Sequence, residues 1–132
     1  MLDSGAFSYV NVLSKAADAS FKRNELLVNN LANNDTPGYK RKDLDFEVCL
    51  NRALESSDTK VKSTLTEKVN NIDLEELTPY AYTDYSELSY RLDQNNVDTQ
   101  TEESELASNQ IVYNTLLESM LNEFNRIKAV LT

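Results

Sequence analysis

The chain has 132 residues, with 22 acidic and 13 basic side chains and no histidine, and its formal net charge is −9 at pH 7. This length corresponds to one domain or less, and the single Cys49 excludes an intramolecular disulfide and a cysteine-based metal site. The absence of histidine removes imidazole acid–base chemistry, and the negative charge argues against a nucleic-acid binder.

The N-terminal residues do not read as a secretory signal, because they lack a basic region followed by an apolar one. No run in the sequence approaches the roughly 20 apolar residues that cross a bilayer. We therefore expect no membrane span. The protein is expected to be either cytosolic or exported by a route that reads no cleaved signal peptide.

A long amphipathic helix is predicted at the N-terminal end, begun by a cap at Asp3 or Ser4. Apolar residues recur at alternating steps of four and three as far as Leu31, and polar residues interrupt this pattern only at Ser20 and Asn24. This spacing is typical of the seam of a coiled coil.

A turn is predicted directly after this helix. Asn33 and Asn34 can adopt the left-handed conformation that ends a helix. Pro37 and Gly38 fit the two central positions of a type II turn, because proline fixes φ at about −65° and glycine takes a positive φ. Many unrelated proteins end a helix in this way, so the turn chemistry alone identifies no family.

The middle of the chain divides in two. Residues 43–54 are predicted to form a short helix, within which Cys49 is expected to be a buried small apolar residue rather than a functional thiol. Residues 56–96 are polar and are predicted to be irregular and extended. The four tyrosines from Tyr80 to Tyr90 fit either contact with another protein or attachment of this segment to the helices. The apolar face of the short helix consists of Phe46, Leu50, Ala53 and Leu54.

The negative charge is concentrated in the middle. Residues 63–105 hold eleven acidic side chains against Lys68 and Arg91, which accounts for the whole net charge of −9. We interpret this acidic stretch as a solvated surface. The two ends of the chain are electroneutral and can pack beside copies of themselves without repulsion.

A second long amphipathic helix is predicted at the C-terminal end, begun by a capping box of Thr99 and Glu102. Arg126 and Lys128 lie near its carboxyl end, where the helix dipole favours positive charge. The same stepping of four and three gives a seam formed by Leu106, Gln110, Tyr113, Leu117, Met120, Phe124, Ile127 and Leu131. The N-terminal and C-terminal helices each span roughly 40 Å and so match in length. We therefore predict a mainly α fold in which these two helices pair as an antiparallel coiled coil.

Both helices carry more apolar residues than one seam buries. A helix that is apolar on more than one stripe is normally covered on more than one side. An intramolecular three-helix bundle would require a third long helix, which the middle of the chain does not offer. We therefore expect neighbouring chains to supply the remaining cover.

Two blocks of the sequence resemble a known family. Residues 29–33 and 36–40 read NNLAN and TPGYK, which is similar to the N-terminal signature shared by bacterial flagellar rod and hook proteins. The continuation at residues 41–47, RKDLDFE, resembles the proximal members of the flagellar basal-body rod protein family in particular. The second block, NNVD at residues 95–98 with the residues that follow it to Asn114, resembles the turn of this family into its C-terminal helix.

The resemblance implies a structural subunit of the proximal rod, with no enzymatic activity, cofactor or metal. Such subunits are exported unfolded through the flagellar type III export apparatus, without a cleaved signal peptide. They polymerise in the periplasm through their terminal helices into a tubular drive shaft, which transmits torque and encloses the export channel. The partners it implies are copies of the chain, other rod proteins, the protein at the junction of the rod with the inner-membrane ring, and the export apparatus.

The resemblance also suggests which residues carry this role. Residues 1–34 and 97–132 would form one discontinuous coiled-coil domain, and residues 35–96 an outer segment of turn, short helix and extended chain. Gln94 departs from the family pattern, because a glycine is common at its position. The turn motif is assigned to Asn33, Thr36, Pro37, Gly38 and Tyr39. Subunit packing is assigned to Leu13, Leu27, Leu31, Tyr113, Leu117, Met120, Phe124 and Ile127.

Two other classes stay open. A chaperone or adaptor of a type III export system is also small, acidic and helical, although it does not need the turn motif. A small enzyme is disfavoured, because no carboxylate is spaced with a nucleophile, a base or a glycine-rich loop in a catalytic pattern.

Overall fold

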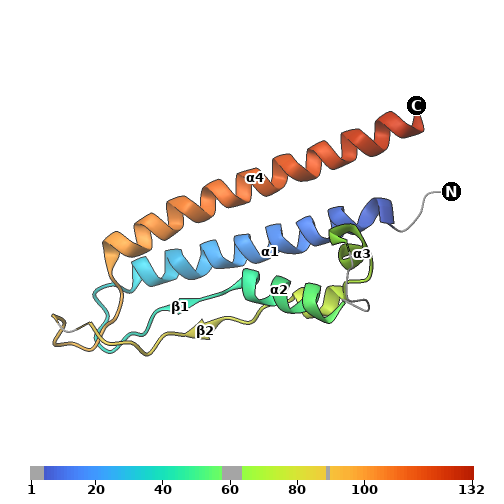
Figure 1. The fold of residues 1–132 in the computed structure, drawn as a ribbon. Coiled ribbons are helices and arrows are strands. Elements are labelled where there is room, and N and C mark those ends of the chain that lie inside the picture. Colours follow the sequence, from blue (N-terminus) through green and yellow to red (C-terminus); the bar gives the residue numbers. More distant parts are fainter. Residues whose placement is uncertain (1–4, 58–63, 89) are drawn as a thin grey trace.

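The computed structural model describes residues 5–57, 64–88 and 90–132. Its elements are α1 (Gly5–Ala32), β1 (Lys42–Asp43), α2 (Phe46–Ser56), α3 (Leu65–Asn70), the 3₁₀ turn η1 (Leu74–Leu77), β2 (Tyr82–Thr83) and α4 (Thr99–Leu131). Helices α1 and α4 lie side by side and run in opposite directions, and the chain between them returns along α1 (Figure 1). The prediction of a mainly helical chain with a long helix at each end is confirmed. The predicted caps Asp3 and Ser4 lie outside the described residues.

The interior of the chain is small and only partly apolar. Polar and charged residues are buried almost as often as apolar ones in the described segments. Every buried side-chain nitrogen and oxygen atom of the described residues has a hydrogen-bond partner, as buried polar groups require. The buried apolar side chains are Val10, Ala17, Ala19, Leu27, Leu44, Ala53, Val69, Leu77 and Val97.

Helix α1 does not end in the predicted left-handed conformation. Neither Asn33 nor Asn34 has a positive φ. Instead, the N–H of Asn33 is shared between the carbonyl groups of Asn29 and Asn30, at 3.1 Å from each oxygen. The side-chain amide of Asn33 donates to the same carbonyl of Asn29 at 2.8 Å. The last turn of the helix is therefore closed by hydrogen bonds, which satisfy carbonyl groups that a helix end leaves open.

The turn after α1 has the predicted type II geometry. Gly38 has a φ of 73°, and the N–H of Tyr39 donates to the carbonyl of Thr36 at 3.2 Å. Pro37 and Gly38 thus occupy the central positions, and glycine takes this φ without steric cost. The N–H of Gly38 donates to the carbonyl of Asp93 at 2.8 Å, which ties the turn to the segment before α4.

The short middle helix begins later than predicted. Asp43 belongs to β1, which pairs antiparallel with β2. Asp45 then caps α2 by accepting a hydrogen bond from the N–H of Val48 at 3.2 Å. Since a capping residue keeps an extended backbone, the helix starts at Phe46 and not at Asp43. The predicted apolar face does turn inward, with Ala53 fully buried.

The segment after α2 contains more helix than predicted. Thr64 and Glu67 form a capping box at the start of α3, each side chain accepting a hydrogen bond from the backbone N–H of the other. The prediction of an irregular, extended chain is therefore wrong for residues 64–77, which form α3 and η1. Val69 and Leu77 bury their side chains and hold both elements in place.

The exposure of Cys49 and of the tyrosines in the middle segment differs from what the sequence suggested. Cys49 is half-buried, whereas the prediction placed it in the interior. Tyr80, Tyr85 and Tyr90 are largely exposed, so burial of their rings does not attach this segment to the helices. Contact with another protein, the other role considered for these tyrosines, stays a prediction.

Gln94 is the only described non-glycine residue with a positive φ, at 63°. A Cβ atom in this region costs about 1–2 kcal/mol, and part of this cost is offset because glutamine has less backbone freedom than glycine in the unfolded chain. We expect Gln94→Gly to raise the free energy of unfolding by about 0.5–1 kcal/mol, measured by urea denaturation. The matched control Leu92→Gly, at an exposed position without a positive φ, should lower it. A destabilised Gln94→Gly chain would contradict this account.

Candidate functional site

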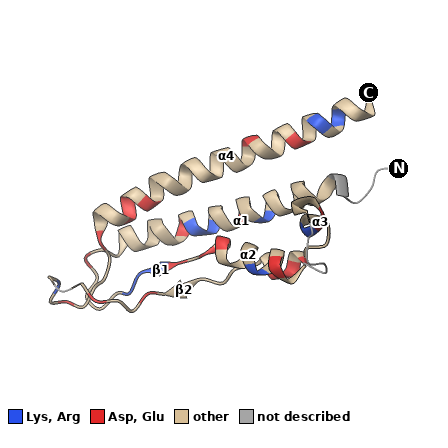
Figure 2. Cartoon of the chain, in the orientation of Figure 1, with Lys and Arg blue, Asp and Glu red and all other residues tan. Residues whose placement is uncertain are grey.

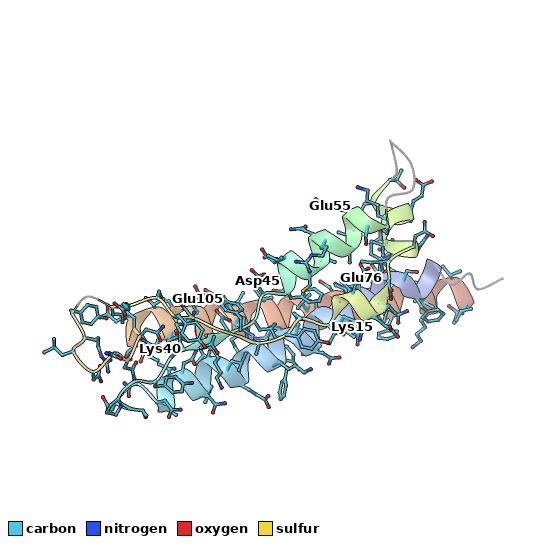
Figure 3. The ribbon with its side chains drawn as sticks, turned by 90° about the horizontal axis from the view of Figure 1, so that it is seen from below. Lys15, Lys40, Asp45, Glu55, Glu76 and Glu105 are labelled. Atoms are coloured by element: carbon cyan, nitrogen blue, oxygen red, sulfur yellow. The ribbon has the colours of Figure 1, made fainter. Side chains whose placement is uncertain are left out.

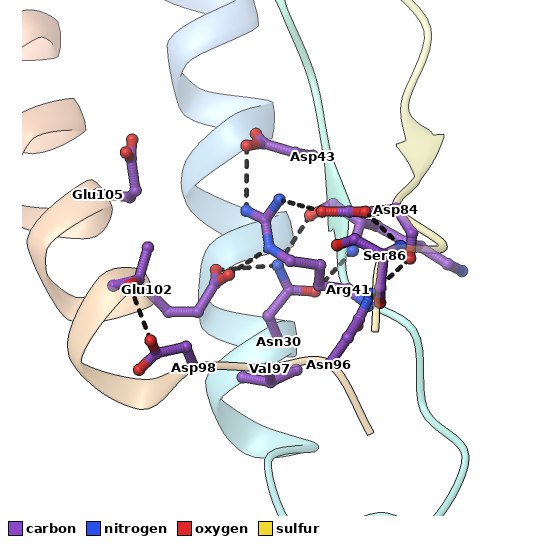
Figure 4. A network of polar contacts seen from close by, with 12 residues as sticks. Asn30, Arg41, Asp43, Asp84, Ser86, Asn96, Val97, Asp98, Glu102 and Glu105 are labelled. Carbon is purple, nitrogen blue, oxygen red and sulfur yellow. Dashed lines mark hydrogen bonds and ion pairs between the residues drawn. The ribbon is translucent and has the colours of Figure 1, made fainter. Parts of the chain in front are cut away.

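Polar side chains converge where the end of α1, β1 and the start of α4 meet (Figure 4). They come from stretches of the sequence that lie far apart, and most of them belong to the two blocks at residues 29–47 and 95–114. We call this cluster the polar junction and define it as Arg23, Asn30, Arg41, Asp43, Asn96 and Glu102.

Glu102 is the centre of the polar junction. Its side chain is 1% exposed although it lies near the start of α4. One carboxylate oxygen accepts a hydrogen bond from Nε of Arg41, and the other accepts one from Nδ2 of Asn30 at 3.1 Å. The predicted capping box is wrong, because Asp98 and not Thr99 caps α4. Glu102 is thereby free to point inward and pair with Arg41.

Two arginines form ion pairs with the carboxylates around Glu102. Arg41 donates to Asp43 at 3.1 Å and to Asp84 at 3.5 Å. Arg23 donates to both carboxylate oxygens of Asp43, at 2.8 and 3.2 Å, and to Glu105 at 2.7 Å. Each buried charge thus has an opposite charge beside it, which is the condition for keeping ions in a protein interior.

Asn30 links α1 to β1. Its side-chain amide donates to the carbonyl of Lys42 at 2.8 Å, and its side-chain oxygen accepts from the N–H of Lys42 at 2.9 Å. The same oxygen accepts from the hydroxyl of Tyr39 at 3.0 Å, and the amide also donates to Glu102. The fully buried side chain therefore uses its complete hydrogen-bonding capacity.

The paired asparagines before α4 join the returning segments. Nδ2 of Asn95 donates to the carbonyls of Asn33 and Thr36, at 2.8 and 2.9 Å. Oδ1 of Asn96 accepts from the N–H of Arg41 at 2.7 Å, and its amide donates to two carbonyls after β2 at 2.6 and 3.0 Å. The turn motif is thus held by the second block of the sequence, and the two blocks form one structural unit.

The charges of the junction determine the pKa of Asp43. Burial alone raises the pKa of Asp43, but hydrogen bonds from Arg23 and from the N–H of Leu44 favour the ionised carboxylate, and the pKa is lowered from its usual value. Burial and the charge of Glu102 raise the pKa of Tyr39, so its hydroxyl remains a donor to Asn30.

The lowered pKa of Asp43 predicts a loss of stability in acid. The free energy that this carboxylate contributes is fully present above its unfolded pKa of about 4 and is lost as the pH falls through its lower folded pKa. We expect Asp43→Asn to cost about 2 kcal/mol at pH 7, and this difference from the natural chain should shrink below about pH 4. Urea denaturation across this pH range measures it, and a difference independent of pH would contradict the assignment.

The predicted subunit-packing residues lie in two settings. Leu27 is buried, and Leu13, Leu31, Tyr113, Met120 and Ile127 are half-buried. Leu117 and Phe124 are 43% and 47% exposed. As far as Ile127, the less exposed stripe of α4 shares the other members of the predicted seam but replaces Gln110, Leu117 and Phe124 by the residue before each. It consists of Leu106, Asn109, Tyr113, Leu116, Met120, Glu123 and Ile127.

A polar pair explains why this stripe departs from the apolar pattern. Ser20 of α1 donates to Oδ1 of Asn109 at 3.0 Å, and Nδ2 of Asn109 donates to the carbonyl of Ser20 at 2.8 Å. Both residues are buried. Ser20, which interrupts the apolar pattern of α1, therefore faces α4. Its partner is Asn109, whereas the predicted seam contained the next residue, Gln110.

None of the six junction residues is among the predicted site residues. The sequence placed Glu102 in a capping box and Asp43 at the start of the short helix, and the other members had no individual role. Membership of the two resembling blocks is the signal that points to most of the cluster, since Arg23 alone lies outside them. In the described segments no group of three or more histidine, cysteine or acidic residues is arranged to hold a metal ion. None of the described helices is long and apolar enough to span a membrane. The arrangement fits mechanical linkage of segments.

No family model matches the chain, but curated relatives do. The flagellar basal body rod protein FlgB of Bacillus subtilis (strain 168) is 37% identical over 120 residues, which cover 91% of this chain and 90% of the relative. FlgB of Aquifex aeolicus (strain VF5) is 32% identical over 125 residues, with 95% and 94% covered. FlgB of Escherichia coli (strain K12) is 30% identical over 125 residues, with 89% and 88% covered. Matches of this extent include the polar junction and most of both long helices, and the chain belongs to the FlgB family of flagellar basal body rod proteins.

Proposed function

We propose that the chain is a structural subunit of the proximal rod and polymerises through α1 and α4 into the tubular shaft that transmits torque and encloses the export channel. The similarity to FlgB proteins supports the place of the subunit in the rod. The apolar surface of the two long helices supports the way in which it polymerises.

The observation that carries this proposal is the number of large apolar side chains that α1 and α4 leave exposed. Contiguous apolar surface of this kind marks sites of protein association. Leu117, Leu121 and Phe124 follow one another at steps of four and three and therefore share one face of α4. The exposed set on the two helices is Phe7, Phe21, Val28, Ile111, Val112, Leu117, Leu121, Phe124, Val130 and Leu131.

On this proposal α1 and α4 of each chain pair as an antiparallel coiled coil, and neighbouring subunits cover the apolar surface that this pair leaves exposed. The rod-core domain of residues 1–34 and 97–132 lines the tube, and residues 35–96 face outward. The partners are copies of the chain, other rod proteins, the protein at the junction with the inner-membrane ring and the type III export apparatus. The chain reaches the periplasmic rod without cleavage of a signal peptide and acts without a cofactor.

Deletion of residues 118–132 tests the proposal, because it removes the exposed stripe of α4 from Leu121 onward. In a strain that lacks its own copy, we expect export to continue, rods to be absent from isolated basal bodies and swimming to be lost. The matched control changes the exposed polar residues Glu118 and Asn122 of the same segment to alanine and should swim normally.

Normal rods built from the shortened chain would contradict the role of α4. The alternative function, a chaperone or adaptor of type III export, predicts a different location. In that case the natural chain would be absent from purified basal bodies and would be found bound to export substrates inside the cell.

A further inference from the structure

A groove of about 330 Å³ opens on the side of the paired helices where α2 begins. Its walls come from α1, α4, β1 and the first turn of α2, so we call it the α2 groove. Val112 on its α4 wall is 50% exposed. Small and apolar side chains that line it are Ala16, Ala19, Leu44, Phe46, Val112 and Leu116.

The α2 groove carries a negative rim. Asp43 and Arg23 lie in its wall and neutralise each other at 2.8 Å. Asp45 and Glu47 also line the groove and are exposed, and neither forms an ion pair with another described residue. Figure 2 shows this acidic colouring where β1 leads into α2. Within the described part of the chain, Asp45 and Glu47 thus add two negative charges, without an ion-pair partner, beside the apolar side chains of the groove.

The carboxyl end of α4 has the complementary character. Residues 124–132 contain Arg126 and Lys128 and no acidic residue, and Figure 2 shows this basic end of α4. The Arg126 side chain is 77% exposed, and its ion pair is with Glu123 on the same helix. Apolar residues accompany these charges, and Phe124, Val130 and Leu131 are all exposed.

The end of α4 cannot reach the groove of its own chain. Val112 and Leu116 of α4 form part of the groove wall, and α4 is a continuous helix to Leu131. Ile127 lies 15 residues beyond Val112, which places it roughly 22 Å further along the helix axis. A helix end that fits the groove must therefore come from another chain. Because the two contacting surfaces differ, such a contact repeats from copy to copy and builds an open array or a ring rather than a symmetric dimer.

We propose that the α2 groove of one copy receives the last two turns of α4 from a second copy of this chain. The apolar residues of the incoming helix end cover Val112 and Leu116, and its basic side chains face Asp45 and Glu47. This inference rests on the proposed function, since it specifies one contact through which copies polymerise.

Charge reversal on each surface tests the contact in the purified full chain. Glu47→Lys alters the groove and Lys128→Glu alters the helix end, and we expect each to weaken self-association at least about tenfold in sedimentation velocity. An equal mixture of the two variants should associate again, because each Lys then faces a Glu on the other chain. The control Glu55→Lys makes the same change at the opposite end of α2, which Figure 3 shows well separated from Asp45, and should leave association unchanged.

Disulfide trapping supplies a second readout that does not depend on charge. In a Cys49→Ser background, which removes the single natural cysteine, a chain with Glu47→Cys mixed with a chain with Val130→Cys should form an intermolecular disulfide, and Glu55→Cys should not replace Glu47→Cys in this reaction. Far-UV circular dichroism confirms that each variant keeps its helices.

The proposal is overturned if the natural chain remains monomeric at every concentration, if Glu47→Lys associates as well as the natural chain, or if the Glu47→Cys chain forms no disulfide with the Val130→Cys chain. Whichever of these results is obtained, the strain with residues 118–132 deleted tests the proposed function independently of this contact. Loss of rods in the deletion strain, together with a failed groove test, would retain the proposed function and reject this contact.

Discussion

Replacing Glu102 by alanine is expected to lower the free energy of unfolding by about 3–5 kcal/mol. The substitution removes the acceptor that Arg41 and Asn30 share in the centre of the polar junction. The Arg41 side chain is only 15% exposed, so its charge would lose its most buried partner and would keep Asp43 and Asp84. A buried ion that loses one partner is costly, because the water that would solvate it in the unfolded chain is absent.

Two comparisons separate the charge of Glu102 from its shape. Glu102→Gln keeps an acceptor oxygen for Arg41 and should cost less, about 2 kcal/mol. The adjacent Glu103 is exposed on α4, and Glu103→Ala should change the free energy of unfolding by less than about 0.5 kcal/mol. Urea denaturation followed by far-UV circular dichroism measures all three. Equal effects of Glu102→Ala and Glu103→Ala would show that the junction does not hold the chain together.

The long helices and the turn are readable from the sequence because their causes are local. An apolar repeat over 28 residues in α1 and 33 in α4 leaves few alternatives to a helix. Pro37 followed by Gly38 determines its own backbone conformation, and the structure has the predicted turn. In these places the neighbouring residues carry the required information.

The role of Glu102 is not readable in this way, because its partner lies 61 residues away. The pattern of Thr followed three residues later by Glu occurs at Thr64 and again at Thr99. After Thr64, the side chain of Glu67 accepts a hydrogen bond from the backbone N–H of its own cap. After Thr99, the side chain of Glu102 instead pairs with Arg41. The Thr-x-Thr-Glu pattern is common to both places, but Asp98 precedes Thr99 and caps α4 in its stead, and the tertiary contact with Arg41 takes up Glu102.

The side of α4 that faces α1 shows the same limit. Apolar periodicity favoured Leu117 and Phe124, since they fall on the steps of four and three that begin at Leu106, yet both are about half exposed. Asn109 is buried instead, because Ser20 offers it a hydrogen-bonding partner 89 residues away. Hydrophobicity alone therefore does not identify the face of α4 that packs on α1, because a polar residue with a partner on α1 is buried there while Leu117 is exposed.

The same reasoning predicts a large effect at Asn30. Asn30→Ala is expected to lower the free energy of unfolding by about 3–4 kcal/mol, because the N–H and carbonyl of Lys42, the hydroxyl of Tyr39 and one oxygen of Glu102 lose a partner together. The adjacent Asn29 is exposed on α1, and Asn29→Ala should be nearly neutral. Urea denaturation of the two variants makes the comparison, and equal midpoints would contradict it.

Asn30→Asp distinguishes the loss of hydrogen bonds from the loss of packing. The new carboxyl keeps the acceptor oxygen for Lys42 and Tyr39, but at neutral pH it places a second negative charge beside buried Glu102. Burial and this repulsion raise the pKa of the new group, so the variant should be least stable at neutral pH and should recover relative to Asn30→Ala as the pH falls. A packing defect alone would give no such pH dependence. Since Asn30 joins the end of α1 to β1 next to the turn, the same pH dependence in rod assembly would support the proposal that the helices polymerise only when the turn is attached to α1.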